Sequence, residues 1–464
     1  MKLKTALAGT LGALLAISLA GCGTGGGSST TAPTSAPPAS TSAAPAPAPS
    51  TTVNQSASSG ATELTFWTFI ALHGKFYETM AGKWNAAHPD KQVHLNVNVM
   101  PYDDMHNQLQ LALNSGQGAP DIVDIEVSKF PNFTTGTPAL MDLTQVAAPY
   151  AADIVQARMQ LYQKDGKQYG LPTHVGTTLA FYNTDLMDKA GVDYTKIKTW
   201  DDFTAAGVAY TKATGKAFAT ADTSASWVID TVMGQLGTDY LDASGKVQVN
   251  NPDMVKTLTL LKGIQTAGAA KTIAGGQPDT EEAFGLLNSG EYAAVIMPEW
   301  FMSRYTAYMP DLKGKVTIAP PPVMDGAKVK TVGGGGTGTA IPSQGKNTAL
   351  ASEFLAYAKL SKDGAIEIWN SLGFDPCNMA LWTDATITKN PDNQFNQYFK
   401  NNVFDVLNQV KDGIGYLPSA TYQAKPNINN MMTTTVLNEI FENGADIQKT
   451  LDTAQADLKN ELGQ

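Results

Sequence analysis

The sequence predicts an α/β fold, and two observations lead to that prediction. From Glu63 onward, short apolar segments of strand length alternate with segments whose apolar residues recur at helical spacing. The chain has 464 residues, of which 43% are hydrophobic and 16% charged, so it can bury the cores of two or three domains. A formal net charge of −10 argues against a nucleic-acid partner, because such proteins need a basic surface.

Three strands and two helices are expected in the first part of the alternating region. The strands are predicted at residues 64–69, 93–99 and 121–127. Apolar residues at positions 76, 80 and 84 predict a helix between the first two strands, and those at 105, 109 and 113 predict a helix before the third. Asp103 can cap the second helix, because its carboxylate can accept hydrogen bonds from the free N–H groups of the first turn.

Further helices are expected to begin at Asn251, Asp279 and Asn347. Glu282 follows Asp279 by three residues, which is the spacing of a capping box. Apolar residues at positions 440, 447 and 451 predict helical structure close to the C-terminal end. The alternation of strands and helices therefore extends over the whole of the chain after residue 63.

The first 22 residues have the features of a processing signal. Lys2 and Lys4 precede an apolar run at residues 6–20, which is short for a membrane span. The run ends in Leu-Ala-Gly-Cys22, which resembles a bacterial lipobox; an ordinary signal peptide with a chance cysteine is the alternative. We therefore predict a lipoprotein signal peptide at residues 1–22, with two or more acyl chains on Cys22, since a single chain anchors a protein only marginally.

Residues 23–62 carry no charge and consist almost entirely of Gly, Ser, Thr, Ala and Pro. Such a segment cannot bury a core and predicts a disordered tether between the membrane and a folded body. The remaining cysteine is Cys377, so no disulfide framework is expected once Cys22 carries lipid.

Motifs of catalysis and metal binding are missing from the sequence. It contains no GxSxG, HExxH, Walker A or EF-hand pattern, and no two of its five histidines have metal-ligand spacing on one helix face. We therefore expect no catalytic residue, no metal and no cofactor. Residues 333–338 match GxGxxG, but residues 339–342 predict an extended segment and not the helix that would receive a pyrophosphate. These glycines instead indicate a flexible connection where the backbone passes close to a ligand or another segment.

Seven short blocks carry a resemblance to a known family. In chain order they are Leu64–Trp67, Gly118–Val123, Leu179–Leu186, Thr199–Phe203, Asn288–Ala294, Pro298–Trp300 and Gly333–Gly336. With these blocks in this order behind a lipobox, the sequence resembles the family 1 extracellular solute-binding proteins of carbohydrate ABC importers, which include the maltodextrin-binding group. Within the family it is most similar to binding proteins for lactose, arabinose or arabinosaccharides.

The resemblance implies a two-lobed periplasmic-binding-protein-like fold of type II, in which each lobe is a sheet flanked by helices and a multi-crossing hinge joins the lobes. Crossings are expected near residues 173–178, 336–340 and 374–376. Lobe 1 would then comprise residues 63–173 and 337–375, and lobe 2 residues 174–336 and 376–464. A ligand would be bound in the cleft between the lobes.

Sugar recognition requires flat aromatic rings for the apolar faces of a sugar and polar side chains for its hydroxyl groups. Three tryptophans are candidates for the first role: Trp67 at a strand end, Trp227 beside two serines, and Trp300 after a strand. Trp300 matches the position of a stacking aromatic in the maltodextrin-binding group, and we expect its indole to be partly exposed. Packing inside the protein is the alternative for all three.

Four polar residues are candidates for binding sugar hydroxyl groups: Glu126, His174, Glu299 and Asp375. Glu126 ends a predicted strand, Glu299 adjoins Trp300, and the other two lie at predicted crossings. A helix cap or surface carboxylate is the alternative for Glu126, and a structural role is the alternative for His174 and Asp375. Where the maltodextrin-binding group has an acidic residue near the first crossing, this chain has Gly176.

The resemblance thus implies a non-enzymatic, monomeric, lipid-anchored protein on the outer face of the cell membrane. Its expected partners are a carbohydrate ligand, the cognate ABC permease and its ATPase, and the membrane through Cys22, with no nucleic acid among them. Two other classes are left open: a secreted glycoside hydrolase, which would also need aromatic and carboxylate side chains in a cleft, and a carbohydrate-binding surface adhesin.

Overall fold

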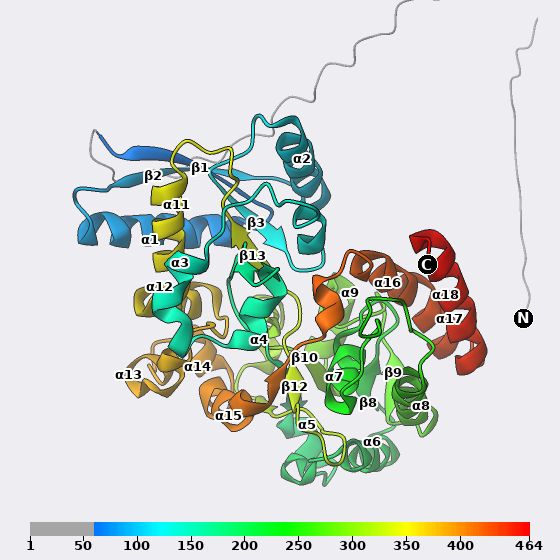
Figure 1. Cartoon of the computed structure of the whole chain (residues 1–464). Coiled ribbons are helices and arrows are strands. Elements are labelled where there is room, and N and C mark those ends of the chain that lie inside the picture. Colours follow the sequence, from blue (N-terminus) through cyan, green and yellow to red (C-terminus); the bar gives the residue numbers. More distant parts are fainter. Residues whose placement is uncertain (1–59) are drawn as a thin grey trace, which may run out of the picture. The chain divides into compact units, whose positions relative to one another are not determined.

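A computed structural model describes residues 60–464 of the chain. The predicted signal peptide, the lipidation site Cys22 and nearly all of the predicted tether lie outside the described residues. The first strand begins at Thr62, the last residue of the predicted tether, because Thr62 pairs with Val93 of the next strand. The described part contains two mixed five-stranded sheets with helices packed around them (Figure 1).

The first sheet has the strand order β2-β1-β3-β13-β6. Its strands are β1 (Thr62–Thr68), β2 (Val93–Val99), β3 (Ile122–Glu126), β6 (Leu171–Pro172) and β13 (Thr337–Ala340). The first three are parallel to one another, whereas β13 runs antiparallel to both of its neighbours. A strand from late in the sequence therefore completes a sheet that begins at the start of the folded body.

The second sheet has the strand order β11-β7-β10-β8-β9. Its strands are β7 (Thr178–Asn183), β8 (Ala217–Ala221), β9 (Ala270–Thr272), β10 (Tyr292–Pro298) and β11 (Val316–Ala319). Two small ladders join β4 (Gln163–Lys164) to β5 (Lys167–Gln168) and β12 (Thr331–Val332) to β14 (Ile414–Gly415). Strands β7 and β10 are buried along their whole length, as expected for the centre of a sheet covered on both faces.

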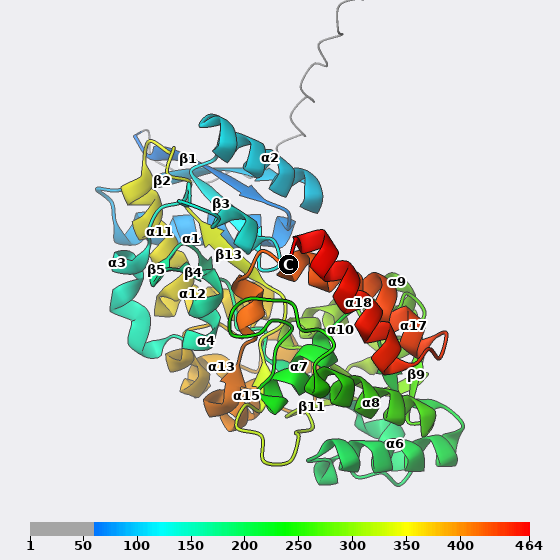
Figure 2. The same ribbon diagram turned by 45° about the vertical axis from the view of Figure 1, so that its right-hand side comes forward.

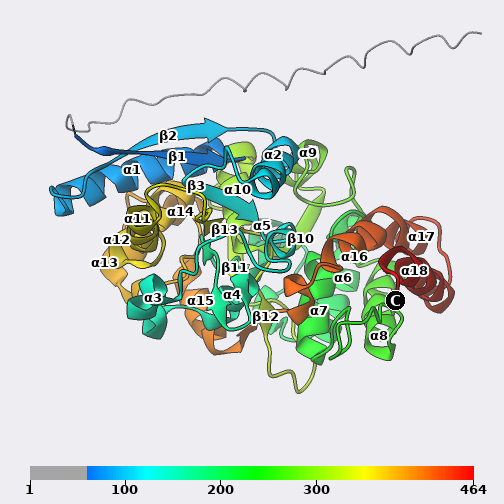
Figure 3. The same cartoon turned by 45° about the horizontal axis from the view of Figure 1, so that its top comes forward.

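Helices near the first sheet come from two distant parts of the chain. They are α1 (Ala71–Ala87), α2 (Tyr102–Ser115), α3 (Thr144–Ala147), α4 (Gln156–Met159), α11 (Thr348–Leu360) and α12 (Lys362–Glu367). Figure 3 shows α1 running along β1 and β2. The predicted apolar stripe of α1 is confirmed, since Phe76, Met80 and Trp84 are all buried.

Eight helices pack around the second sheet. They are α5 (Thr184–Lys189), α6 (Trp200–Thr214), α7 (Trp227–Leu236), α8 (Pro252–Thr266), α9 (Glu281–Asn288), α16 (Lys425–Met431), α17 (Leu437–Phe441) and α18 (Ile447–Leu462). Figure 2 shows the C-terminal helices α17 and α18 beside α8. A further group follows β10 or the third predicted crossing: α10 (Met302–Tyr308), α13 (Ala385–Thr388), α14 (Gln394–Tyr398) and α15 (Val403–Val410).

Local sequence explains several helix starts, and the structure corrects two predictions. Asn251 caps α8 as predicted, because its side chain accepts a hydrogen bond from the Met254 N–H at 2.9 Å. Asp103 does not cap α2: Pro101 occupies that position, and the carboxylate lies in the first turn of the helix. The capping box predicted at Asp279 is also wrong, because Thr280 caps α9.

Candidate functional site

Three chain segments lie against one another between the two sheets. The first crossing, residues 173–177, links β6 to β7, and the second crossing, residues 333–336, links β12 to β13. The second lies just before its predicted position, because residues 337–340 are already paired in the first sheet. The Gly334 N–H donates to the Gly176 carbonyl at 2.9 Å, and the Val175 N–H donates to the Asp375 carbonyl at 3.0 Å. Residues 374–376, the third predicted crossing, thus lie against the first crossing, and the first crossing lies against the second.

Two of the predicted ligand-binding carboxyl groups lie inside this three-segment crossing. Asp375 is 0% exposed and accepts hydrogen bonds from the N–H groups of Gly176 and Thr177 at 2.8 and 2.9 Å. Glu299 is also 0% exposed, and its Oε2 accepts from the backbone N–H of Asp375 at 3.0 Å. Their position makes these carboxyl groups part of the crossing itself, and neither lines the cavities described below.

The environment of this carboxyl pair shifts both pKa values upward. Burial, with the neighbouring Asp375 as the second cause, raises the pKa of Glu299 well above its ordinary value. Burial also raises the pKa of Asp375, although hydrogen bonds from Thr177 and Gly176 oppose that shift. Glu299 Oε1 has no hydrogen-bond partner among the described residues.

A first cavity of about 260 Å³, which we name the His174 cavity, adjoins the crossing on one side. Its lining consists of Phe69, Ile70, Leu72, His73, Glu126, His174, Trp300, Ser303, Arg304, Gly335, Gly336, Thr337, Leu372 and Phe374. Its residues come from the first sheet, from the segment that directly follows β10 of the second sheet, and from all three crossings. The cavity therefore lies where segments from both sheets converge.

A second cavity of about 260 Å³, which we name the Trp227 cavity, shares Glu126 and Gly335 with the first. The other charged or amide side chains in its lining are Arg158, Asp230, Gln277, Lys425 and Asn429. Its apolar lining includes Trp227, at the first position of α7, and Leu161. Among the predicted site residues, Glu126, His174, Trp227 and Trp300 thus line the two cavities, whereas Trp67 lines neither.

Two of the three predicted tryptophans, Trp227 and Trp300, contact each other where the cavities adjoin. The rings of Trp227 and Trp300 meet edge to face with centroids 5.7 Å apart, and Trp300 Nε1–H donates to the Gly334 carbonyl at 3.0 Å. The Arg304 guanidinium lies 5.2 Å from the Trp300 ring centroid and is held by Asp279 at 2.8 Å. Trp300 is 8% exposed, which is less than we expected from the sequence.

The glycine run explains how these rings come so close to the backbone. A Cβ atom on Gly334 would lie 2.7 Å from the Pro298 ring and 3.1 Å from the Trp227 indole. At Gly336, φ is +102° and a Cβ would overlap the Arg158 guanidinium. The prediction that the backbone passes close to other segments here is therefore confirmed, and a strand, β13, follows the run.

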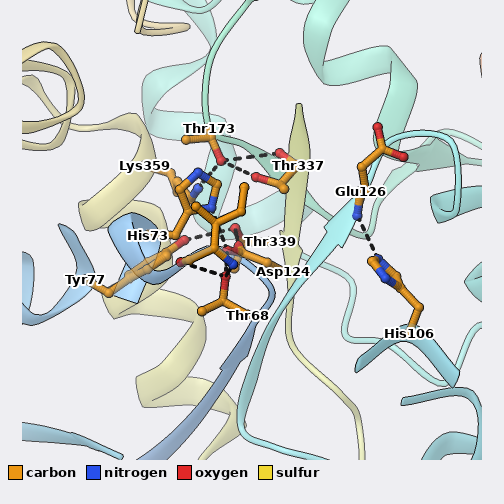
Figure 4. Close-up of polar contacts among 11 residues, drawn as sticks. Thr68, His73, Tyr77, His106, Asp124, Glu126, Thr173, Thr337, Thr339 and Lys359 are labelled. Carbon is orange, nitrogen blue, oxygen red and sulfur yellow. Dashed lines mark hydrogen bonds and ion pairs between the residues drawn. The ribbon is translucent and has the colours of Figure 1, made fainter. Parts of the chain in front are cut away.

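Glu126 ends β3 and is oriented by neighbouring groups. Its Oε2 accepts from the Ser128 N–H at 2.7 Å, from the Ser128 hydroxyl and from the Tyr102 hydroxyl at 3.1 Å. Figure 4 shows its backbone N–H directed at His106, whose Nε2 accepts that bond at 3.1 Å. Burial raises the pKa of Glu126, while the Ser128 and Tyr102 hydrogen bonds lower it.

His174 is buried in the first crossing, and neither of its ring nitrogens has a hydrogen-bond partner among the described residues. Burial, followed by the nearby Arg158 and two other basic side chains, lowers its pKa well below the ordinary value. The neutral ring therefore offers one N–H donor and one acceptor nitrogen. Since unpaired buried polar atoms are costly, these atoms are the kind of groups that a ligand satisfies.

Three residues at the site were missed by the sequence reasoning. Arg158 is buried and links two crossings: its Nε–H donates to the His174 carbonyl at 3.0 Å and its Nη2–H to the Gly335 carbonyl. The Lys425 ammonium lies 3.8 Å from Asp230 Oδ1 and 3.8 Å from the Tyr240 ring centroid, and burial lowers its pKa. The third residue is His73, in the first turn of α1. Nothing in their sequence spacing could have found Arg158 and Lys425, whose neighbours come from distant segments.

Within residues 60–464, no three His, Cys, Asp or Glu side chains are grouped so that they could hold a metal ion. In the same range, no helix is long and apolar enough to cross a membrane.

Two mixed sheets joined by a three-segment crossing, with cavities lined from both sides, define a two-lobed periplasmic-binding-protein-like protein. The chain belongs to the bacterial extracellular solute-binding protein family, whose model matches residues 71–365. Family and relatives are binding proteins by description, which agrees with a non-enzymatic protein outside the cytoplasm.

Two relatives are similar over most of the chain. The arabinooligosaccharide-binding protein of Bacillus subtilis (strain 168) is 41% identical over 408 residues, which cover 87% of this chain and 93% of the relative. A protein of the same name from Halalkalibacterium halodurans is 39% identical over 392 residues, covering 84% and 87%. The solved structure of the sugar-binding protein MalE from Xanthomonas citri superimposes with a TM-score of 0.74 at 17% identity, covering 87% of this chain and 98% of that one, and it shares the fold.

Proposed function

We propose that this chain captures arabino-oligosaccharides between its two lobes and delivers them to an ABC importer. The observation that carries the proposal is the pair of adjoining cavities around Trp227 and Trp300, with Glu126 lining both. The two relatives near 40% identity, both named arabinooligosaccharide-binding proteins, support the choice of ligand.

The chemistry of the lining fits a neutral, hydroxyl-rich ligand. Indole rings can cover the C–H faces of a sugar, and carboxylate, amide and imidazole groups can bind its hydroxyl groups. In the Trp227 cavity the cationic side chains Arg158 and Lys425 are matched by the acidic side chains Glu126 and Asp230. A balanced lining of this kind has no excess of positive charge that would select an anionic ligand.

The way in which the two sheets are joined supports capture by closure of the lobes. In this proposal lobe 1 comprises residues 63–173 and 337–375, and lobe 2 comprises residues 174–336 and 376–464. The ligand binds both lobes and shifts the protein from open to closed forms, which the permease and its ATPase distinguish by shape. A monomer suffices for this mechanism.

The predicted lipobox supports attachment of the chain to the outer face of the cell membrane. Acyl chains on Cys22 would hold the protein there, and residues 23–62 would serve as the tether. In a Cys22→Ala variant the protein should be secreted or remain unprocessed, and it should leave the detergent phase in which the wild type partitions. Equal partitioning of the two would contradict lipid anchoring.

Isothermal titration calorimetry of the purified chain with arabinobiose, arabinotriose, arabinose and lactose tests the ligand. We expect saturable binding of the arabino-oligosaccharides. At a ligand concentration 100 times the Kd, the free energy of unfolding should rise by about 2.7 kcal/mol. The sugars should be recovered unchanged, because a binding protein does not cleave its ligand, whereas a glycoside hydrolase would release shorter sugars. Absence of binding to every arabino-oligosaccharide, or release of shorter sugars, would overturn the proposal.

A further inference from the structure

A second imidazole lies in the wall of the His174 cavity. His73, the third residue of α1, lines this cavity although it is only 2% exposed. Its Nδ1 lies 2.9 Å from Asp124 Oδ2, and its Nε2 is buried without a hydrogen-bond partner among the described residues. The protein thus fixes Nδ1 through Asp124, whereas Nε2 is available for a hydrogen bond with a ligand.

Asp124 is held firmly in the strand behind His73. It is 0% exposed; its Oδ2 also accepts from the Thr68 hydroxyl at 2.9 Å, and its Oδ1 accepts from the Thr339 hydroxyl at 2.6 Å. Figure 4 shows His73, Thr68 and Thr339 gathered around this carboxylate, with Tyr77 bonded to Thr339 at 2.9 Å. Strands β1, β3 and β13 all contribute to this network, so it joins three neighbouring strands of the first sheet.

The charge on Asp124 determines which nitrogen of His73 carries the proton. Burial alone would raise the pKa of Asp124, but the hydrogen bonds from His73 and Thr339 and the charge of Lys359 hold it below its ordinary value. An ionised carboxylate only accepts hydrogen bonds, so His73 Nδ1 must be the N–H donor. In the neutral ring Nε2 then presents a lone pair.

We propose that His73 Nε2 accepts a hydrogen bond from a sugar hydroxyl in the His174 cavity and that Asp124 is the positioning residue that fixes this tautomer. The inference rests on the proposed function and deepens it, because it states that one hydroxyl group of the ligand must be a hydrogen-bond donor. A hydroxyl at this place must donate, so a ligand with a methoxy group there is rejected.

Two substitutions of His73 test the roles of its two ring nitrogens one at a time. The amide nitrogen of Asn can replace Nδ1, so His73→Asn retains the bond to Asp124 and loses the group in the cavity. The longer Gln places its amide near Nε2, so His73→Gln retains a carbonyl acceptor for the ligand and loses the bond to Asp124. Asp124→Asn removes the charge and allows the other tautomer, in which Nε2 is a donor.

Titration calorimetry with arabinotriose should give a Kd about 10- to 100-fold weaker for His73→Asn, because a ligand hydroxyl and the cavity would lose a buried hydrogen bond. We expect His73→Gln to stay within about threefold of the wild type, and Asp124→Asn to weaken binding by about tenfold. The matched control is His94, whose Nδ1 also lies 2.9 Å from a carboxylate, that of Glu63, in β2 and outside both cavities. His94→Asn should bind as the wild type does.

The protonation of the His73 ring can also be measured directly in the wild type, which does not depend on the folding of any variant. Nitrogen-15 NMR of the wild type should show His73 protonated at Nδ1, with the Nε2 resonance shifting when arabinotriose is added. A proton on Nε2, an unchanged Nε2 resonance at saturation, or wild-type affinity in a folded His73→Asn variant would each overturn the inference. If the wild type does not bind arabinotriose at all, the proposed function and this inference fall together, whereas binding that is insensitive to His73 overturns the inference alone.

Discussion

The two cavities are similar in volume and share Glu126 and Gly335, yet their linings differ in kind. The His174 cavity combines apolar rings with two imidazoles, each with a ring nitrogen that has no hydrogen-bond partner among the described residues, and its charged side chains are Arg304 and the shared Glu126. The Trp227 cavity carries formal charges and amides, among them Asp230, Lys425 and Asn429. Under the proposed function, we expect the imidazoles of the His174 cavity to fix the positions of the ligand hydroxyl groups, whereas the longer charged and amide side chains of the Trp227 cavity can adjust to the ligand.

The largest expected effect is that of Trp300→Ala, because this ring lies where the two cavities adjoin and is nearly buried. We expect a loss of about 2 to 4 kcal/mol in binding free energy, roughly 30- to 1,000-fold in affinity. Loss of its packing should also cost about 3 to 5 kcal/mol of folding stability. Calorimetric titration and thermal melts without ligand measure the two effects.

Trp369→Ala is the matched control for this change. Trp369 is 0% exposed and lines neither cavity, so its loss should reduce stability and leave the affinity of the folded protein unchanged. Equal affinities of the Trp300→Ala variant and the wild type would show that the ring only packs.

Trp227→Ala should separate binding from stability more cleanly. This side chain is half-buried at the start of α7, so its removal should cost only about 1 kcal/mol of stability. Loss of a ring that faces the ligand should weaken binding by about 1 to 3 kcal/mol. An affinity for arabinotriose equal to that of the wild type would mean that the ligand does not reach the Trp227 cavity.

Lys425→Met tests whether the charged lining of the Trp227 cavity is used. Replacing a buried ammonium that lacks a hydrogen-bond partner by a side chain of similar volume should change stability by less than about 1.5 kcal/mol. Binding should weaken by about tenfold if the ammonium donates to a sugar hydroxyl. Lys262→Met is the control, since the Lys262 ammonium also lies near an aromatic ring, 5.8 Å from the Phe441 centroid, and is outside both cavities; an equal effect of the two changes on affinity would count against a direct role.

The smallest expected effect is the contribution of Glu299 to the pH dependence of folding stability. Its folded-state pKa is raised above the unfolded value near 4.5, so the unfolded chain loses this proton first as pH rises. Stability should therefore fall between that value and the folded-state pKa, by up to about 1.4 kcal/mol per pH unit from this group. Chemical denaturation at several pH values should show a shallower decline for Glu299→Gln, whereas exposed Glu442→Gln should follow the wild type.

The strands and helices that were predicted from the sequence are found in the structure because their signals are local. The strand at residues 93–99 is found at the predicted bounds, and Asn251 caps its helix as expected. The errors at Asp103 and Asp279 are also local, since proline at one helix start and threonine at the other displaced the expected caps.

The site was harder to predict because distant segments make it. The Gly176 N–H donates a hydrogen bond to Asp375 although 199 positions separate the two residues, so spacing alone could not place Asp375 within the crossing. Trp67 was misjudged for a different reason. The alternation along β1 directs its ring to the opposite side from Phe66, where it packs against a hydrophobic cluster that includes Leu109 and Val123. His73 was recognisable only as one histidine of five, because its importance comes from Asp124, 51 residues away.

The position of β13 has a consequence for how the chain acquires its structure. This strand lies between β3 and β6, so the first sheet is incomplete until residue 340 is available. A chain that leaves the ribosome or crosses a membrane from its N-terminal end therefore cannot finish this sheet until most of its length has passed. Such long-range pairing slows folding, and a fragment that ends before Thr337 would leave the edges of β3 and β6 without the strand that lies between them.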